Sequence, residues 1–269
     1  MVIGMKTSDY KAAFNSVKFS DNFEQDTEEY LQRAADLKTQ KEDNYMNKHK
    51  VLKTSLIAAA MVVILSISAF AVWKLLLPKE VVQKTGDTAL AEAFASKDAI
   101  TINQSVQTGD YTITLSGIVS GKGLTDYCED VLSDESYIVA SVAYTDGRKI
   151  AQAGETGILF TPLVSGYKPW QVNAWTLNGG NSSFVYEGVN YFIFECSNIE
   201  IFADHAVYLA AYQGDAPDSS TFIMSKNGEI SFAKEFTAPH AIFTLPLDPA
   251  KANPDAVKKL LESNGITMD

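Results

Sequence analysis

The chain has 269 residues, of which 46% are hydrophobic, 11% aromatic and 20% charged. Its 22 basic and 33 acidic side chains give a formal net charge of −11, which argues against nucleic acid or anionic lipid headgroups as partners. Residues 1–53 hold nine basic and nine acidic side chains, so the whole acidic excess lies after them.

The first segment, residues 1–53, is expected to be a short helical tail. Tyr10, Phe14 and Val17 share one helical face, and a second helix begins at Asp21, which forms a capping-box-like pair with Glu24. Two such helices are too short to bury a core of their own. They could form a hairpin that merely precedes the next segment, or a docking segment for a cytosolic protein. Lipid-surface binding is disfavoured because their polar faces mix both signs of charge. The partner-binding candidates are Phe14, Val17, Phe19, Phe23, Tyr30 and Leu31.

An uncharged run of 20 residues, Thr54–Trp73, follows the tail and is bracketed by Lys53 and Lys74. As an α-helix it would be about 30 Å long, close to the thickness of a bilayer's hydrocarbon core. The sequence therefore predicts a single transmembrane helix at 54–73. A buried core helix and a signal peptide cleaved near Ala69-Phe70-Ala71 are the alternatives, and the 53 preceding residues argue against cleavage.

Charge near the ends of this run predicts its orientation. Four lysines lie in the 15 residues before it and three in the 15 after it, a small excess that favours a cytoplasmic N-terminus. We therefore expect a single-pass protein of the cell membrane, with the lipid bilayer as one partner and an extracytoplasmic C-terminal part.

Residues 74–98 are expected to be a membrane-proximal connector. Leu75–Pro78 would end the membrane helix, since proline disfavours a helical residue before it, and 87–94 would form a short helix.

Residues 99–269 change to short runs of β-branched and aromatic residues separated by turn signals such as Asn227-Gly228. This pattern predicts an antiparallel immunoglobulin-like sandwich. Six of its aromatic residues are expected in the core: Trp170, Trp175, Tyr191, Phe192, Phe194 and Tyr208. Ten strands are predicted, at 99–105, 110–119, 137–145, 157–163, 183–189, 190–197, 206–212, 220–225, 229–236 and 240–246.

The chain ends in a predicted helix with Asn253 as N-cap, Pro254 at the first helical position and Gly265 as the left-handed residue after it. The expected fold class is thus a mainly β ectodomain with a C-terminal helix, a single transmembrane helix and a short helical N-terminal tail.

The sequence contains few motifs that would indicate a chemical function. Cys128 and Cys196 both lie after the uncharged run, where an oxidising exterior would permit a disulfide, and two unpaired thiols are the alternative. The acidic residues around Cys128 indicate a solvent-exposed loop. Neither a metal-ligand spacing, a phosphate-binding glycine loop nor a nucleophile elbow is present, so we expect no enzyme activity, cofactor or metal.

Several stretches resemble a family of single-pass membrane proteins from Gram-positive bacteria that is often labelled anti-sigma-factor-like and has an outer domain of unknown function. They are Tyr10–Phe14, Val17–Phe23, the alanine-rich run and Asp110–Lys122. The resemblance implies a tail that restrains an extracytoplasmic-function sigma factor and an outer immunoglobulin-like sensor. The His-x-x-x-Cys-x-x-Cys motif of the zinc-containing anti-sigma domains is absent. We therefore expect a signalling or regulatory protein; the alternative is an anchored extracytoplasmic binding or adhesion module with no cytosolic partner.

Overall fold

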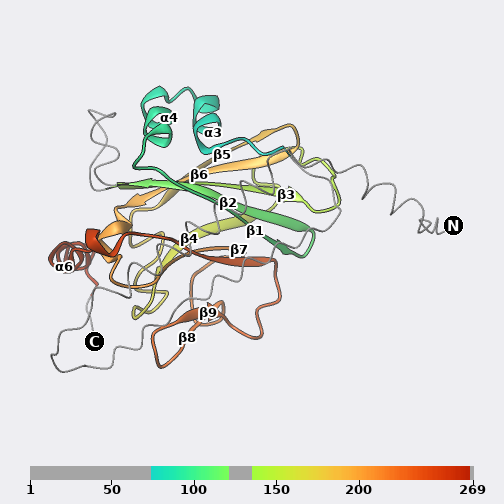
Figure 1. Cartoon of the computed structure of the whole chain (residues 1–269). Coiled ribbons are helices and arrows are strands. Elements are labelled where there is room, and N and C mark those ends of the chain that lie inside the picture. Colours follow the sequence, from blue (N-terminus) through green and yellow to red (C-terminus); the bar gives the residue numbers. More distant parts are fainter. Residues whose placement is uncertain (1–73, 121–134, 267–269) are drawn as a thin grey trace, which may run out of the picture. The chain divides into compact units, whose positions relative to one another are not determined.

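The structure is a computed structural model that describes residues 74–120 and 135–266, drawn in colour in Figure 1. These residues belong to the second of two compact units into which the chain divides, Ser66–Asp269.

Two antiparallel sheets make up most of this unit. The larger sheet has five strands in the order β1-β2-β3-β6-β5, the smaller has three in the order β10-β7-β4, and β8 and β9 form a separate hairpin (Figure 1). Each strand overlaps one of the ten predicted segments. The bounds are β1 Ile100–Thr108, β2 Tyr111–Ser120, β3 Glu135–Tyr144, β4 Ile158–Val164, β5 Gly180–Tyr186, β6 Val189–Ser197, β7 Val207–Gln213, β8 Phe222–Met224, β9 Ile230–Phe232 and β10 His240–Thr244.

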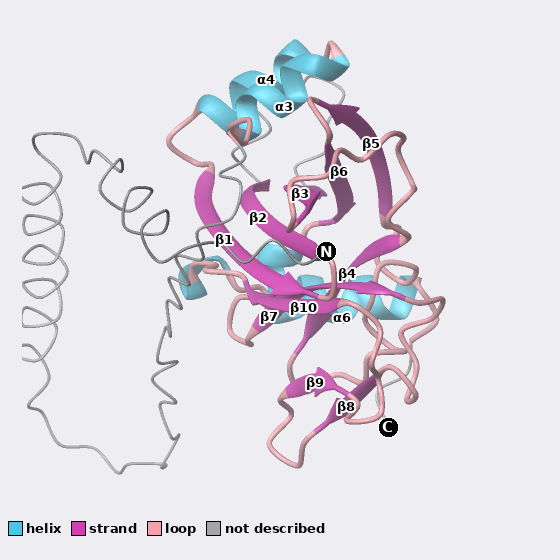
Figure 2. Cartoon of the chain, turned by 90° about the vertical axis from the view of Figure 1, so that its right-hand side faces the viewer, coloured by secondary structure: helices cyan, strands magenta, loops and turns pink. Residues whose placement is uncertain are grey.

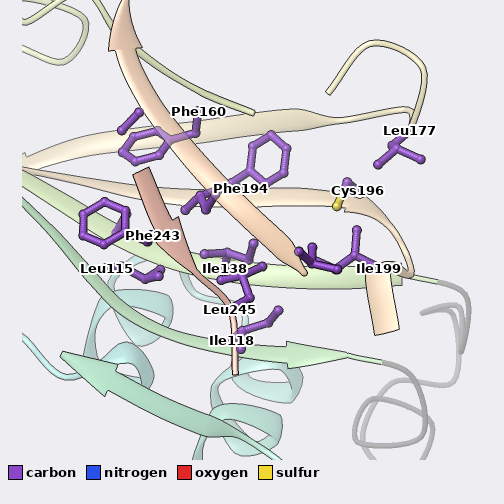
Figure 3. Close-up of a cluster of buried hydrophobic side chains, with 14 of the residues drawn as sticks. Leu115, Ile118, Ile138, Phe160, Leu177, Phe194, Cys196, Ile199, Phe243 and Leu245 are labelled. Carbon is purple, nitrogen blue, oxygen red and sulfur yellow. The ribbon is translucent and has the colours of Figure 1, made fainter. Parts of the chain in front are cut away.

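The main core lies between the two sheets. Leu115 and Ile138 of the larger sheet meet Phe160 of β4 and Phe243 of β10 in one buried cluster (Figure 3). In β3 all eight residues from 136 to 143 are buried, although only alternate ones face this cluster. The sequence of a strand whose two faces are both covered is a nearly continuous run of apolar residues. Burial on both faces therefore requires a second layer outside the five-stranded sheet.

That layer consists of two helices, α3 (Pro78–Thr85) and α4 (Thr88–Ala95), which lie over the outer face of the five-stranded sheet (Figure 2). Pro78 occupies the first turn of α3, where its missing N–H is not needed. The Asp87 side chain caps α4 by accepting the Leu90 N–H at 2.8 Å. Val81 and Val82 are fully buried against Val139 and Ile193 of the sheet.

A bulge in the sheet makes room for α3. Pairing between β2 and β3 shifts register between Leu115 and Gly117. A Cβ at Gly117 would lie 2.9 Å from the Ile100 carbonyl oxygen and 3.1 Å from Cγ of Pro78. Only glycine allows α3 to begin this close to the strand.

The C-terminal helix α6 (Pro254–Ser263) has the termini that the sequence predicts. The Asn253 side chain accepts the Ala256 N–H at 3.1 Å, and Gly265 has a φ of 69°. Val257 and Leu261, one turn apart, are buried against the main cluster. Two short 3₁₀ helices, η1 (Ile199–Phe202) and η2 (Pro249–Lys251), lie before it.

The expected fold class needs a correction. In the residues that the structure describes, no helix is long and apolar enough to cross a membrane. Helices α3, α4 and α6 have eight, eight and ten residues and extend only about 12–15 Å, because each is a short amphipathic element that covers part of the β core. The described residues form a mainly β unit with three short helices, none of which is the single transmembrane helix of the expectation. Residues 8–19, 21–41 and 54–73 lie outside the described residues.

Leu75 and Leu76 pack against the outer layer, and the Leu76 N–H donates to the Tyr191 hydroxyl at 3.1 Å. The helix that Leu75–Pro78 is expected to end lies outside the described residues, so that expectation stays a prediction. Pro78 begins a helix here because proline is favoured in the first turn. Trp170 and Trp175 are 49% and 65% exposed rather than buried, because they lie in the 165–179 loop outside the two sheets.

Candidate functional site

A cavity with a volume of about 460 Å³ lies beside α6. Its floor is apolar, formed by Val257, Leu261 and Ile266 together with the ring of Tyr167. Its rim carries Asp204, His205, Lys258 and Glu262, with Pro254 closing one side. Cavities of this size, mostly apolar with a few polar groups, are typical of small-molecule sites.

Three separate elements bring these side chains together. Tyr167 follows β4 through a turn in which Gly166 has a φ of 86° and donates its N–H to the Gly228 carbonyl at 2.9 Å. Asp204 and His205 follow η1, where the His205 N–H donates to the Phe202 carbonyl at 2.8 Å. The remaining lining residues come from α6 and the residues next to it. The site therefore exists only because the C-terminal helix folds back against the ends of β4 and η1.

Packing holds Tyr167 in place. Its ring makes edge contacts with Phe202 and His205, with centroids 5.7 and 5.3 Å apart. Burial, and then the nearby Asp204 carboxylate, raise the pKa of Tyr167 above its ordinary value. The phenol therefore stays protonated at neutral pH and can donate a hydrogen bond.

Charges on the rim are only loosely paired. His205 Nε2 lies 3.9 Å from Asp204 Oδ1, and Lys258 Nζ lies 3.9 Å from Glu262 Oε1. Both distances exceed those of a hydrogen bond, and all four side chains are more than a third exposed. With His205 neutral, two carboxylates face one ammonium, so the rim has a formal charge of −1.

A second, smaller hollow of about 100 Å³ is lined by residues of β4, of β5 and of the 165–179 loop. Exposed Trp175, Leu159 and Asn181 contribute to it, with Asp215 at its rim. The 165–179 loop crosses this side of the sheets, and Thr161 Oγ1 accepts the Ala174 N–H at 2.8 Å.

Of the residues proposed from the sequence, the structure describes Cys196, which lines neither the cavity nor the hollow. Phe14, Val17, Phe19, Phe23, Tyr30, Leu31 and Cys128 lie outside the described residues, so their roles stay predictions. Cys196 forms no disulfide with a described residue and is only 2% exposed, and its sulfur lies among apolar side chains in the main core (Figure 3). Burial raises its thiol pKa, which makes it unreactive. A bridge to Cys128 stays an untested prediction.

Sequence reasoning missed the cavity residues. Val257 and Leu261 carry a visible signal, since they are one turn apart in the predicted terminal helix. Tyr167, Asp204 and His205 carry none, because nothing in the sequence shows which loops meet that helix. In the described ranges, no group of three or more histidine, cysteine or acidic side chains is placed to hold a metal ion.

Comparisons with known proteins found no matching family model, no matching curated protein and no matching solved structure.

Proposed function

We propose that this chain is a non-catalytic regulatory protein whose β unit binds a small organic cation with an apolar body in the cavity beside α6. The observation that supports this most directly is the pairing of a buried apolar floor with a rim of net negative charge. The floor would take the apolar body, and Asp204 and Glu262 would attract the charged group.

Binding is favoured over catalysis by the residue types in the cavity. The described lining contains neither serine, threonine nor cysteine that could act as a nucleophile. Asp204 and His205 are adjacent but too far apart to form a hydrogen bond, so the aspartate does not orient the imidazole as in a hydrolytic triad.

The regulatory half of the proposal rests on the sequence. The apolar faces of the tail, with Phe14 and Phe23 among them, would hold a cytosolic regulator, and the family resemblance makes a sigma factor the first candidate. Location at the cell membrane, with the β unit outside, is part of the same proposal and rests on the uncharged run at 54–73. A β-rich unit is compatible with an immunoglobulin-like sensor.

Calorimetric titration of the full chain in detergent tests the ligand class. We expect 2-phenylethylamine to bind at least about ten-fold more tightly than phenylacetate, which has the same ring and the opposite charge. Ile266→Arg removes apolar lining and adds a positive charge, so it should abolish this preference. Lys259→Ala, an exposed position of α6 outside the cavity lining, is the matched control. Equal affinity for the two compounds would contradict the proposal.

Co-purification tests the tail. Full-length chain extracted in detergent should retain one stoichiometric cytosolic protein, and Phe14→Ala combined with Phe23→Ala should release it, because truncated aromatic anchors lose most interface energy. If no specific partner is recovered, or if the double variant retains it, the alternative gains support: an anchored binding or adhesion module. The exposed Trp170 and Trp175 favour that second candidate, since tryptophan is enriched at interfaces.

A further inference from the structure

Strand β5 is an edge strand that lacks the usual protection. It ends the row β1-β2-β3-β6-β5 (Figure 2). In the hydrogen bonds among described residues, none reaches its outer edge. Its sequence, Gly180-Asn-Ser-Ser-Phe-Val-Tyr186, contains neither charge nor proline, and its pairing with β6 runs through seven residues without a bulge. Natural sheets normally block such edges to prevent association.

The other three edge strands of the two main sheets are blocked. β1 contains a bulge at Asn103, which has a φ of 52°, and its Thr108 hydroxyl accepts the His240 N–H of β10 at 2.9 Å. The same contact places β10 beside β1. β4 contains Pro162, and the 165–179 loop lies along its edge. β5 is therefore the exception among the edge strands of the two main sheets.

The hairpin that joins β5 to β6 determines which groups of β5 point outward. Glu187 and Gly188 both have positive φ values, 53° and 93°, as in a two-residue type I′ turn. Tyr186 and Val189 then form a hydrogen-bonded pair, and the pattern alternates along the strand. Asn181, Ser183 and Val185 consequently direct their N–H and C=O groups away from β6.

These outward groups are self-complementary. Two copies of β5 in antiparallel orientation can place Ser183 opposite Ser183 and Asn181 opposite Val185. Each of these pairs can exchange two backbone hydrogen bonds, and one two-fold axis through Ser183 relates the copies. In the same register Tyr186 lies opposite Gly180, where an aromatic ring can cover the bare backbone.

Charges at the two ends of β5 also match in this register. Lys84 of α3 lies over the Tyr186 ring, 4.1 Å from its centroid. At the other end the Glu195 side chain lies next to Gly180, and its Oε1 is 3.2 Å from the position that a Cβ on Gly180 would occupy. Neither side chain forms a salt bridge within the described parts of the chain. Antiparallel pairing brings Lys84 of each copy toward Glu195 of the other, on the same face of the sheet.

We propose that β5 is a dimerisation edge, at which two copies of this chain join their five-stranded sheets by antiparallel β5–β5 pairing centred on Ser183. The bare edge, the direction of its backbone groups and the Lys84–Glu195 complementarity support the same register. This inference is independent of the cavity and of the tail.

Light scattering of the full chain in detergent, with the detergent contribution subtracted, tests the pairing. We expect the mass of two chains for the wild type and for Ser183→Ala. Ser183→Pro removes an outward N–H that β6 does not use, so it should give the mass of one chain while the circular dichroism spectrum is unchanged. A monomeric wild type, or a Ser183→Pro protein that is folded and still dimeric, would overturn the proposal.

Charge exchange between copies supplies a second test that does not depend on proline. Lys84→Glu and Glu195→Lys should each weaken the dimer by roughly three- to thirty-fold, since each places like charges together at both ends. An equal mixture of the two single variants should form a mixed dimer with both attractive pairs restored. Native mass spectrometry of chains with different tags measures it. If the mixture associates no better than either variant alone, the register is wrong.

Discussion

At the residue scale, two buried asparagines have opposite roles. Asn173 is 1% exposed and fully used: its Nδ2 donates to the Pro169 carbonyl at 2.8 Å, and its Oδ1 accepts the Trp175 N–H at 2.9 Å. Asn190 is 0% exposed, and neither its Nδ2 nor its Oδ1 has a partner in the described ranges. Its cross-strand neighbours are Val142 and Val185. An orphaned amide destabilises the folded state, whereas a satisfied one organises a loop.

Substitution of these two residues by leucine should therefore change stability in opposite directions. Asn190→Leu removes two unsatisfied polar atoms and should raise the free energy of unfolding by about 1–3 kcal/mol. Asn173→Leu leaves the Pro169 carbonyl and the Trp175 N–H without their partner, and should lower it by a similar amount. Chemical denaturation of the full chain in detergent measures both. Destabilisation by Asn190→Leu would show that the amide is satisfied in solution.

The exposed charges at one end of the larger sheet illustrate how neighbours set ionisation. The Glu155 carboxylate accepts the Ala151 N–H at 2.8 Å, which is the main cause of its lowered pKa. The Tyr144 hydroxyl donates to Glu155 at 3.1 Å, and this bond is the main reason that the pKa of Tyr144 rises to about 12. At neutral pH the Glu155 carboxyl is therefore charged, and the Tyr144 hydroxyl keeps its proton.

At the element scale, helix α6 forms a wall of the cavity, so the cavity exists only when this helix is folded. Val257 and Leu261 bury one face of the helix, and the Asn264 side chain donates to the Thr176 carbonyl at 2.7 Å. A helix of ten residues has little stability of its own in water. Its cap and its apolar face therefore contribute a large share of its stability.

Asn253→Ala should show this coupling between cap and cavity. Loss of the side-chain acceptor for the Ala256 N–H should cost about 1 kcal/mol. Because α6 supplies much of the cavity lining, the affinity for 2-phenylethylamine should fall in the same variant. Thermal unfolding and calorimetric titration measure the two effects, and Lys259→Ala should change neither. Unchanged affinity in a destabilised Asn253→Ala protein would separate the helix from the site.

At the scale of the whole β unit, the two sheets carry further layers on both outer faces. Helices α3 and α4 cover the five-stranded sheet, and the β8–β9 hairpin packs Phe222 and Ile230 against Leu163 and Tyr212 of the smaller sheet. One hydrogen bond ties the residues before α3 into this arrangement, from the Leu76 N–H to the hydroxyl of buried Tyr191.

Tyr191→Phe should loosen that attachment without disrupting the core. The ring is retained and only the acceptor is lost, which should cost about 0.5–1.5 kcal/mol locally. We expect faster hydrogen exchange at the Leu76 amide and unchanged exchange in β6. Tyr208→Phe is the control, since its hydroxyl makes no hydrogen bond to a described residue. Equal exchange at Leu76 in both variants would show that the contact does not hold the segment.

The sequence by itself determined the mainly β class, the ten strand segments and both ends of α6, because these depend on local periodicity, turn residues and caps. It did not determine α3, where a proline that reads as a stop begins a helix, nor the exposure of Trp170 and Trp175. Only the tertiary structure decided which loops meet α6 around the cavity and which strand ends the sheet uncovered. Those features depend on contacts between residues far apart in the chain, and local sequence patterns do not predict such contacts.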